Sequence, residues 1–350
     1  MRTDHVLRIG DSRSSGVGDE SVDLVVTSPP YPMIEMWDDQ FAAASEAVSR
    51  SLSEGDGEDA FEAMHTLLDE VWDEVVRVLR PGGIACVNVG DATRSVDDEF
   101  HCFPNHARVT EAFRERGFTT LPNVLWRKPT NRLTKFMGSG MLPTNAYVSL
   151  EHEYVLVFRK GSARRFQPHD EARYESAFFW EERNRWFSDL WTLQGSRQGR
   201  TGDGRARAGS FPVELPLRLI RMYSTYGDRV YDPFAGTGTT TLAAMLAGRD
   251  SVGTELESDL LGGFEDRLTD LPERSATRTD ERLGRHREFV RERDEPLGYE
   301  AVHYDVPVVT EQERHIRLYE VTNVERMVGE EKECEREREE MRFGVDYEPR

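Results

Sequence analysis

Apolar positions in the first part of the chain alternate between strand-like and helix-like patterns. A β-rich apolar run at residues 22–27 stops at a Pro-Pro pair, and a second buried run follows at residues 84–89. Between them, residues 58–79 carry large apolar side chains three and four positions apart, which predicts an amphipathic helix that ends at the Pro-Gly-Gly of residues 81–83. Strand, helix and strand in this order predict a βαβ unit and therefore a parallel sheet.

The same reading of periodicity predicts further elements along the chain: helices at residues 105–116, 213–225 and 238–247, and strands at 124–126, 154–158, 229–232 and 251–255. Residues 195–210 have no apolar periodicity and are expected to form a loop. From residue 270 onward the chain is highly charged, with one short β-like stretch at residues 302–309. The acidic run at residues 330–340 is expected to be a solvated helix or a frayed tail.

Composition narrows the class of protein. The 350 residues allow one large domain or two ordinary ones, and a hydrophobic content of 37% indicates a folded globular protein rather than a disordered acidic chain. No apolar run approaches the length of a membrane-spanning helix, and the start of the chain lacks the apolar core of a signal peptide. Three cysteines that lie far apart do not make a disulfide framework. We therefore expect a soluble cytoplasmic protein with no membrane partner.

The charge is unusual in kind and in distribution. The formal net charge is −20, and only four of the 45 basic residues are lysines. An acid-rich, lysine-poor composition is typical of proteins from a high-salt cytoplasm, which we favour over the alternative of a GC-rich genome. Residues 121–230 contain 18 basic and 11 acidic residues, a net charge of +7, so the remainder carries −27. The total argues against a nucleic-acid partner, whereas the basic middle of the chain does not.

A first chemical motif, Asp232-Pro233-Phe234-Ala235-Gly236-Thr237-Gly238-Thr239-Thr240, stands between a predicted strand and a predicted helix. Glycines at such a junction let a ligand approach the backbone, and the helix N-terminus offers free N–H groups. Glu255 ends the next strand, where a carboxylate can accept both hydroxyls of a ribose. The lysine of a P-loop and the third glycine of a dinucleotide fingerprint are missing. The motif therefore suits a nucleoside without a pyrophosphate, S-adenosylmethionine, although an ordinary tight turn is the alternative.

A second motif, Thr27-Ser28-Pro29-Pro30-Tyr31, follows the strand at residues 22–27, at the edge of a parallel sheet where ligands bind. The prolines fix the backbone, and their carbonyls remain available as acceptors. A serine hydroxyl, a proline carbonyl and an aromatic ring together can hold a planar base that carries an exocyclic amine, because the ring stacks while the oxygens accept the amine hydrogens. Taken alone, Pro-Pro-Tyr is also compatible with a rigid turn.

Together the two motifs resemble those of the amino-methylating DNA methyltransferases, which modify N4 of cytosine or N6 of adenine. The catalytic motif of that family is (D/N/S)-P-P-(Y/F/W), and its cofactor motif is D-P-F-x-G-x-G-T-T. Here the catalytic motif comes first, which is similar to the β-type circular order of the family. The resemblance covers about residues 5–270. It implies a class-I, Rossmann-like, doubly wound mixed α/β sheet and S-adenosyl-L-methionine as the cofactor.

Other segments resemble the family in the same order. Residues 79–83 and 152–160 resemble its later catalytic-region motifs, and Asp11 stands where the family's acid contacts the adenine of the cofactor. Phe211 and Pro212 open a segment that resembles the helix packed against the methionine part of the cofactor. The order argues against release-factor glutamine methyltransferases, in which the cofactor motif comes first. A 5-methylcytosine enzyme is excluded because it needs a cysteine after a proline, and none of the three cysteines follows one.

Candidate DNA contacts lie in the basic middle of the chain. One cluster contains Arg127 and Lys128, followed by Arg132 and Lys135. Four more arginines alternate with glycines in the expected loop: Arg197, Arg200, Arg205 and Arg207. Such a loop can follow a phosphate backbone and place arginines on guanine edges, whereas the alternative is a flexible linker with solvated charge. The resemblance puts target recognition between about residues 161 and 210, and the shortness of that stretch favours a short recognition site, for example the palindrome CTAG that some N4-cytosine members of the family recognise.

The resemblance divides the chain into four parts: a catalytic half at 1–160, a target-recognition region at 161–210, a cofactor half at 211–270 and a charged extension at 271–350. A metal site is not expected, because the histidines and the cysteine of residues 101–106 have no second ligand pair at zinc spacing. The expected macromolecular partner is double-stranded DNA, with a cognate restriction endonuclease as a further candidate, and the enzyme is expected to be a monomer or a homodimer.

The expected reaction is transfer of a methyl group to N4 of cytosine, because S-P-P-Y is typical of the N4-cytosine branch of the family. The target base is flipped out of the duplex, Tyr31 stacks on it, and Ser28 with the carbonyl of Pro29 or Pro30 accepts hydrogen bonds from the amine. Two alternatives remain open: an N6-adenine DNA methyltransferase, and a catalytically inactive DNA-binding protein with a methyltransferase fold.

Overall fold

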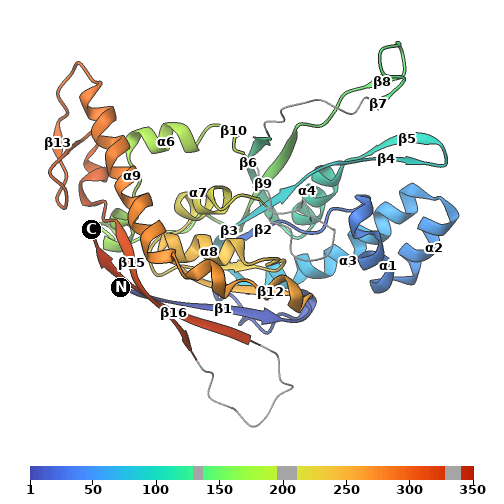
Figure 1. The fold of residues 1–350 in the computed structure, drawn as a ribbon, viewed down its shortest axis with the longest axis horizontal. Coiled ribbons are helices and arrows are strands. Elements are labelled where there is room, and N and C mark those ends of the chain that lie inside the picture. Colours follow the sequence, from blue (N-terminus) through green and yellow to red (C-terminus); the bar gives the residue numbers. More distant parts are fainter. Residues whose placement is uncertain (129–136, 195–210, 328–339) are drawn as a thin grey trace, which may run out of the picture.

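One large mixed sheet forms the centre of the protein (Figure 1). The computed structural model describes residues 1–128, 137–194, 211–327 and 340–350. In spatial order, its strands within this part of the chain are β10 (Leu190–Thr192), β6 (Phe118–Arg127), β9 (His152–Lys160), β3 (Leu79–Val89), β2 (Val22–Thr27), β11 (Arg229–Asp232), β12 (Asp250–Glu255), β1 (Arg2–Ile9), β16 (Glu340–Pro349) and β15 (Tyr319–Met327). Three short hairpins stand apart from it: β4 (Ala92–Val96) with β5 (Glu99–Phe103), β7 (Met137–Gly138) with β8 (Ala146–Tyr147), and β13 (Tyr299–Glu300) with β14 (Pro307–Val308).

The centre of the sheet is parallel and its flanks are antiparallel. Strands β3, β2, β11, β12 and β1 run in one direction. On one side β9 runs against both β3 and β6, and on the other β16 runs against both β1 and β15. The predicted βαβ unit is confirmed as β2, α3 (Gly57–Val78) and β3. Because the central strands are parallel, their carboxyl ends meet at one edge, where open α/β sheets bind ligands.

Helices cover both faces of the sheet. Val25 of β2 packs into the apolar cluster of α3, whereas its neighbours Leu24 and Val26 pack into the cluster of α7 (Glu214–Tyr223) and α8 (Thr239–Ala247). Alternate side chains of a strand point to opposite faces, so a strand that is buried throughout must be covered on both sides. The other helices are α1 (Asp38–Ala44), α2 (Glu46–Glu54), α4 (Asn105–Glu115), α5 (Glu171–Glu175), α6 (Trp180–Trp186) and α9 (Leu271–Arg291). The result is the doubly wound mixed sheet that was expected.

Most predicted elements are present with small shifts at their ends, and one boundary is wrong. The helix of residues 58–79 ends at Val78, and the Pro-Gly-Gly that was expected to stop it lies inside β3. Leu79 already pairs with Val22, whereas Ile84 pairs with Leu24. The stretch of β3 between these two pairs is therefore longer than the matching stretch of β2. An irregularity of this kind accommodates proline and glycine within a strand.

The charged C-terminal part contains more regular structure than its sequence indicated. Strands β15 and β16 and the long helix α9 were missed, and of the β-like stretch at 302–309 only Pro307–Val308 forms a strand. In β16, Phe343, Val345 and Tyr347 are buried, and the backbone of Met1 exchanges two hydrogen bonds with that of Tyr347, at 3.1 and 2.9 Å. The two termini thus lie side by side (Figure 1). Of the acidic run predicted at residues 330–340, residues 330–339 lie outside the described residues.

None of the helices in the described part of the chain is long and apolar enough to cross a membrane.

Candidate active site

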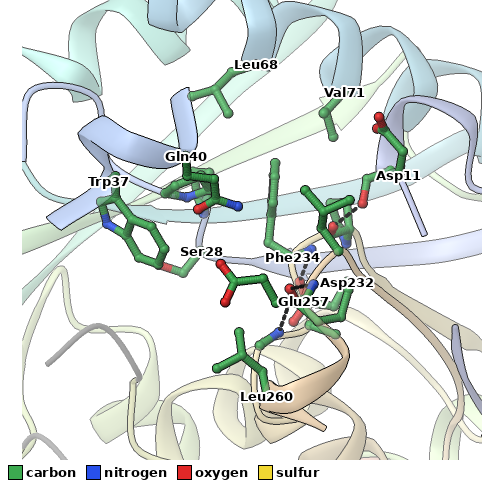
Figure 2. A pocket seen from close by; sticks show the side chains of 18 of the residues that line it. Asp11, Ser28, Trp37, Gln40, Leu68, Val71, Asp232, Phe234, Glu257 and Leu260 are labelled. Atoms are coloured by element: carbon green, nitrogen blue, oxygen red, sulfur yellow. Dashed lines mark hydrogen bonds between the residues drawn. The ribbon is translucent and has the colours of Figure 1, made fainter. Parts of the chain in front are cut away.

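A cavity of about 220 Å³ opens at the carboxyl edge of the parallel strands (Figure 2). Its lining includes these residues expected from the sequence: Asp11, Ser28, Pro29, Pro30, Phe211, Asp232, Pro233, Phe234, Gly236, Thr239 and Glu255. Tyr31, Pro212 and Gly238 do not line it, although all three lie in segments that do. The fold therefore brings the two sequence motifs, one after β2 and the other after β11, to the same cavity.

Asp232 joins the two motifs. Its carboxylate, at the end of β11, accepts hydrogen bonds from the hydroxyl of Thr27 at 2.6 Å and from the backbone N–H of Phe234 at 3.0 Å. Thr27 is the last residue of β2, so this bond ties the turn after β11 to the start of the Ser-Pro-Pro-Tyr segment. Burial of the carboxyl group raises the pKa of Asp232 to about 6.

The glycine turn after Asp232 has a conformation that other residues adopt at a cost. Gly236 and Gly238 have φ angles of +53° and +76°, and a Cβ on Gly238 would lie 2.4 Å from the ring of Phe264. Gly238 is also the residue from which α8 begins. Gly238 therefore lets the backbone turn sharply from β11 into the helix and does not itself line the cavity.

Glu255 holds the turn from the neighbouring strand. One carboxylate oxygen accepts the backbone N–H of Gly236 at 2.7 Å, and the other accepts the backbone N–H of Glu257 at 2.9 Å. Burial raises the pKa of Glu255 above its ordinary value. Each carboxylate oxygen has a further lone pair, so this side chain can accept two more hydrogen bonds from donors in the cavity. A ribose presents two such hydroxyl donors.

The remaining walls fit an adenine and a polar group beside it. Leu68 and Val71 of α3 lie on the opposite side of the cavity from Leu260 (Figure 2). Gln40 lies at the cavity beside Trp37, and its buried amide oxygen has no hydrogen-bond donor among the described residues. An apolar slot, a carboxylate and an unsatisfied acceptor together match the chemistry of S-adenosylmethionine. These helix residues were missed, because nothing in their local sequence distinguishes a cavity wall from an ordinary core position.

Asp11 lies at the cavity, but its carboxylate is engaged. It accepts hydrogen bonds from the backbone N–H of Arg13 at 2.9 Å and from the Arg13 guanidinium at 2.7 Å, and these contacts lower the pKa of Asp11. The carboxylate is thus oriented by its own turn, ahead of the short helix at residues 12–14.

A network of side-chain hydrogen bonds surrounds Tyr31. Its hydroxyl lies 3.0 Å from that of Ser28, donates to Glu153 at 3.0 Å and accepts from the Asn88 amide at 2.8 Å. Asn88 also donates to Glu153 at 2.7 Å, and Lys128 forms an ion pair with the other Glu153 oxygen. Burial beside Glu153 raises the pKa of Tyr31 well above its ordinary value, so the phenol remains a donor at neutral pH. Ser28 consequently donates to Tyr31, accepts a long hydrogen bond from the Asn88 amide at 3.4 Å and keeps one further lone pair.

Asn88 and Glu153 are site residues to which the sequence assigned no role. Asn88 is the polar position in the otherwise apolar run at residues 84–89, and it is 2% exposed. Glu153 lies in the segment at 152–160 that resembled a catalytic-region motif. A polar side chain in a buried strand needs a partner, and this was the available signal for Asn88. The identity of the partner depends on β9 pairing antiparallel with β3.

The expected DNA contacts are only partly within the described chain. Arg127 is 58% exposed and pairs with Glu151 at 3.1 Å, and Lys128 is paired with Glu153. The loop arginines Arg197, Arg200, Arg205 and Arg207, together with Arg132 and Lys135, lie outside the described residues. Across the described part of the chain, no group of histidine, cysteine and acidic side chains is arranged to hold a metal ion; His106 instead bonds to Asp91 at 2.8 Å.

Comparison with known proteins places this chain among DNA methylases. The N6_N4_Mtase family, described as DNA methylase, matches residues 22–263. The chain is 46% identical over 325 residues to the type II methyltransferase M.MthZI of Methanothermobacter thermautotrophicus, covering 91% of each protein. It is 48% identical over 280 residues to the type II methyltransferase M.MjaI of Methanocaldococcus jannaschii, covering 77% of this chain and 92% of the relative.

Solved structures agree on the fold. The Thermus thermophilus protein TTHA0409, determined in complex with S-adenosyl-L-methionine, aligns with a TM-score of 0.59 at 33% identity, covering 75% of this chain and 93% of its own. The cytosine-N4-specific PvuII DNA methyltransferase aligns with a TM-score of 0.52 at 19% identity, covering 77% and 87%. The second likeness supports the fold alone. The expected class-I methyltransferase architecture is confirmed.

Proposed function

This chain belongs to the N6_N4_Mtase family of DNA methylases, and from that premise we propose that it transfers a methyl group to N4 of cytosine in double-stranded DNA. It is a site-specific DNA methyltransferase, and its methyl donor is S-adenosyl-L-methionine. The choice of cytosine over adenine, the residues assigned to the reaction and the DNA contacts are our proposal.

The observation that carries the choice of cytosine is Ser28 in the position of the amine acceptor. The Ser-Pro-Pro-Tyr form of the motif is typical of the N4-cytosine branch of the family. Ser28 lines the cofactor cavity, and its hydroxyl lies 3.0 Å from that of Tyr31. A base amine that reaches this serine therefore comes next to the bound cofactor, which supplies an electrophilic methyl group.

The protein's contribution to the reaction is positioning and proton handling. The target base is first flipped out of the duplex, and Tyr31 lies beside it. The Ser28 hydroxyl oxygen accepts one amine hydrogen and the carbonyl of Pro29 or Pro30 accepts the other. These bonds turn the nitrogen lone pair out of conjugation with the ring and toward the methyl group. No covalent bond between enzyme and base is needed, and orientation supplies most of the rate.

The hydrogen-bond chain behind Ser28 gives the surplus proton a route. After methyl transfer the amine nitrogen carries one proton too many. It passes to the Ser28 hydroxyl oxygen as the serine proton moves to Tyr31, and the Tyr31 proton moves to the Glu153 carboxylate, 3.0 Å away. Lys128 and Asn88 hold that carboxylate in place. Glu153 is thus the proposed end of the relay.

Product analysis tests the proposal directly. The full chain is incubated with unmethylated DNA and radiolabelled S-adenosyl-L-methionine, at low salt and in molar KCl, and the DNA is digested to nucleosides. We expect label in N4-methylcytosine. Label only in N6-methyladenine would overturn the choice of base, and absence of cofactor binding by calorimetry would favour an inactive DNA-binding protein. Sequencing the methylated DNA then gives the recognition motif, which is also the site that a cognate restriction endonuclease, a further proposed partner, would cut.

A further inference from the structure

The hairpin β7–β8 projects from the body of the protein (Figure 1). Its second strand ends at Tyr147, only a few residues before Glu153, the partner of Tyr31. At its base the backbone N–H of Lys128 donates to the carbonyl of Glu151 at 2.9 Å, and the Lys128 side chain pairs with Glu153. The two ends of the segment that carries the hairpin, Lys128 and Glu151, are therefore fixed beside the site proposed to receive the flipped base.

A neighbouring hairpin supports β7–β8 from the same edge. The hairpin β4–β5 begins just after Gly90, which packs against the Tyr31 ring, with no room for a larger residue without displacing it. Phe100 of β5 stacks on Tyr147 of β8, with ring centroids 4.4 Å apart and planes 8° apart. The N–H of Ser139 donates to the carbonyl of Asn145 at 2.8 Å and closes the turn. The tip is thus presented by a braced structure.

The β7–β8 hairpin and the residue that follows it expose large apolar side chains to a degree unmatched in the rest of the described chain. Met141 and Leu142 in the turn are 83% and 68% exposed and Val148, directly after β8, is 81% exposed, whereas the next large apolar side chain, Leu256, is 58% exposed and lines the cofactor cavity. Isolated exposed apolar residues are normal, but a cluster on a projecting hairpin indicates a surface that a partner covers.

The charge of the segment indicates what that partner is. This protein has 65 acidic residues, yet none lies between Glu115 and Glu151, the stretch that contains the hairpin, while Arg127 and Lys128 at its base pair with Glu151 and Glu153. A segment free of acids in so acidic a protein fits a polyanion. A polyanion with an apolar interior is a nucleic-acid duplex, whose stacked bases admit methionine, leucine and proline side chains as wedges.

We propose that Met141 and Leu142 enter the duplex beside the target base and occupy the stack that the flipped base leaves. The proposal rests on the proposed function, because it requires a base to be extruded. Its physical basis is that unpairing and unstacking a base is unfavourable, and an apolar side chain in the gap restores part of the lost stacking. Met141 and Leu142 are positioning residues and do not touch the reacting atoms.

The test compares two duplexes that carry the recognition motif. In one the target base is paired, and in the other it lies opposite an abasic site, so that unpairing no longer opposes flipping. The variant is Met141→Ala, Leu142→Ala, and the matched control is Tyr299→Ala, Val302→Ala, which removes two exposed apolar side chains at β13, far from the site (Figure 1). Calorimetric binding of S-adenosyl-L-methionine shows that each variant is folded.

We expect the single-turnover rate of the hairpin variant to fall about tenfold or more on the paired duplex and by a clearly smaller factor on the abasic one, where only unstacking still opposes flipping. The control variant keeps the wild-type rate on both. Fluorescence of 2-aminopurine at the target position should rise less with the hairpin variant than with wild type. This measurement of flipping does not depend on turnover.

Three outcomes would overturn the proposal that Met141 and Leu142 enter the duplex. An unchanged rate on the paired duplex means that the tip does not assist flipping, and an equal loss on both duplexes means that it serves binding or structure only. If the hairpin substitutions change the sedimentation of the protein but leave its single-turnover rate unchanged, the exposed surface contacts a second copy of the chain instead. The chemical identity of the methylated base enters none of these readouts, so an adenine product would contradict the proposed function and leave this proposal standing.

Discussion

The two halves of the site are built in different ways. The two carboxylates of the cofactor half, Asp232 and Glu255, lie in one segment of the chain and accept backbone N–H groups, while other walls of the cavity come from α1 and α3. The target half combines side chains from β3, from β9 and from the segment after β2, in which Tyr31, Asn88 and Glu153 bond to one another. A local turn fixes the first half, whereas only the pairing of β2, β3 and β9 fixes the second. Binding of the cofactor and turnover should therefore be separable by mutation.

The largest expected effect is on turnover, from the target half. In the variant Ser28→Ala, Tyr31→Ala the amine loses an acceptor and the relay to Glu153 is broken, so we expect methyl transfer to fall about 1,000-fold or more. Cofactor affinity, measured by calorimetry, should change by less than about tenfold, because Glu255 and the glycine turn are untouched. Full activity of the double variant in the labelled-DNA assay would show that these residues do not form the catalytic site.

An intermediate effect, of the opposite kind, is expected from the cofactor half. Glu255→Gln keeps one oxygen acceptor but loses the charge and an acceptor for a ribose hydroxyl, so cofactor affinity should fall about 10- to 30-fold. Turnover at saturating cofactor should recover to within about threefold of wild type. If turnover stayed low at saturation while affinity was normal, Glu255 would belong to the chemical step and the separation of the two halves would be wrong.

The smallest effect on turnover is expected from Asp232, which joins the two halves of the site. The prediction at this residue concerns the pH dependence of the free energy of unfolding. Its folded pKa is raised to about 6 from an ordinary value of 3.8, so the folded protein binds a proton at this site between these pH values and the unfolded chain does not. This carboxyl therefore lowers the free energy of unfolding as the pH rises from 4 to 6, by about 3 kcal/mol at most.

Replacing Asp232 by asparagine removes that titration. Both described hydrogen bonds end on a single oxygen, which the amide of Asn can still supply. Denaturant unfolding at pH 4, 5, 6 and 7 should show that Asp232→Asn gains stability relative to wild type as the pH rises through this window. A constant difference across the series would mean that the carboxyl is not protonated in the folded protein.

Local chemistry explains which parts of the fold the sequence predicted well. Strands β2 and β11 were predicted with their observed bounds, because each is a short apolar run bounded by turn residues. The residues of the Asp-Pro-Phe turn and Glu255 were assigned to one cofactor site, and they line one cavity. Such features depend on neighbours within a few residues. The C-terminal strands were missed because β16 is polar on its outer face and pairs with β1, at the other end of the chain.

What the sequence determined by itself was the chemistry: two motifs, their order, and the class of ligand that each can hold. Only the tertiary structure decided which side chains lie next to these motifs. Pairing of β9 with β3 brings Glu153 to Tyr31, and α1 and α3 close the cavity with Gln40 and Leu68. Strand register and helix packing depend on surfaces that meet only after folding, so no local pattern encodes these neighbours. The charge of Lys128, which the sequence assigned to DNA, is accordingly paired with a carboxylate of the site.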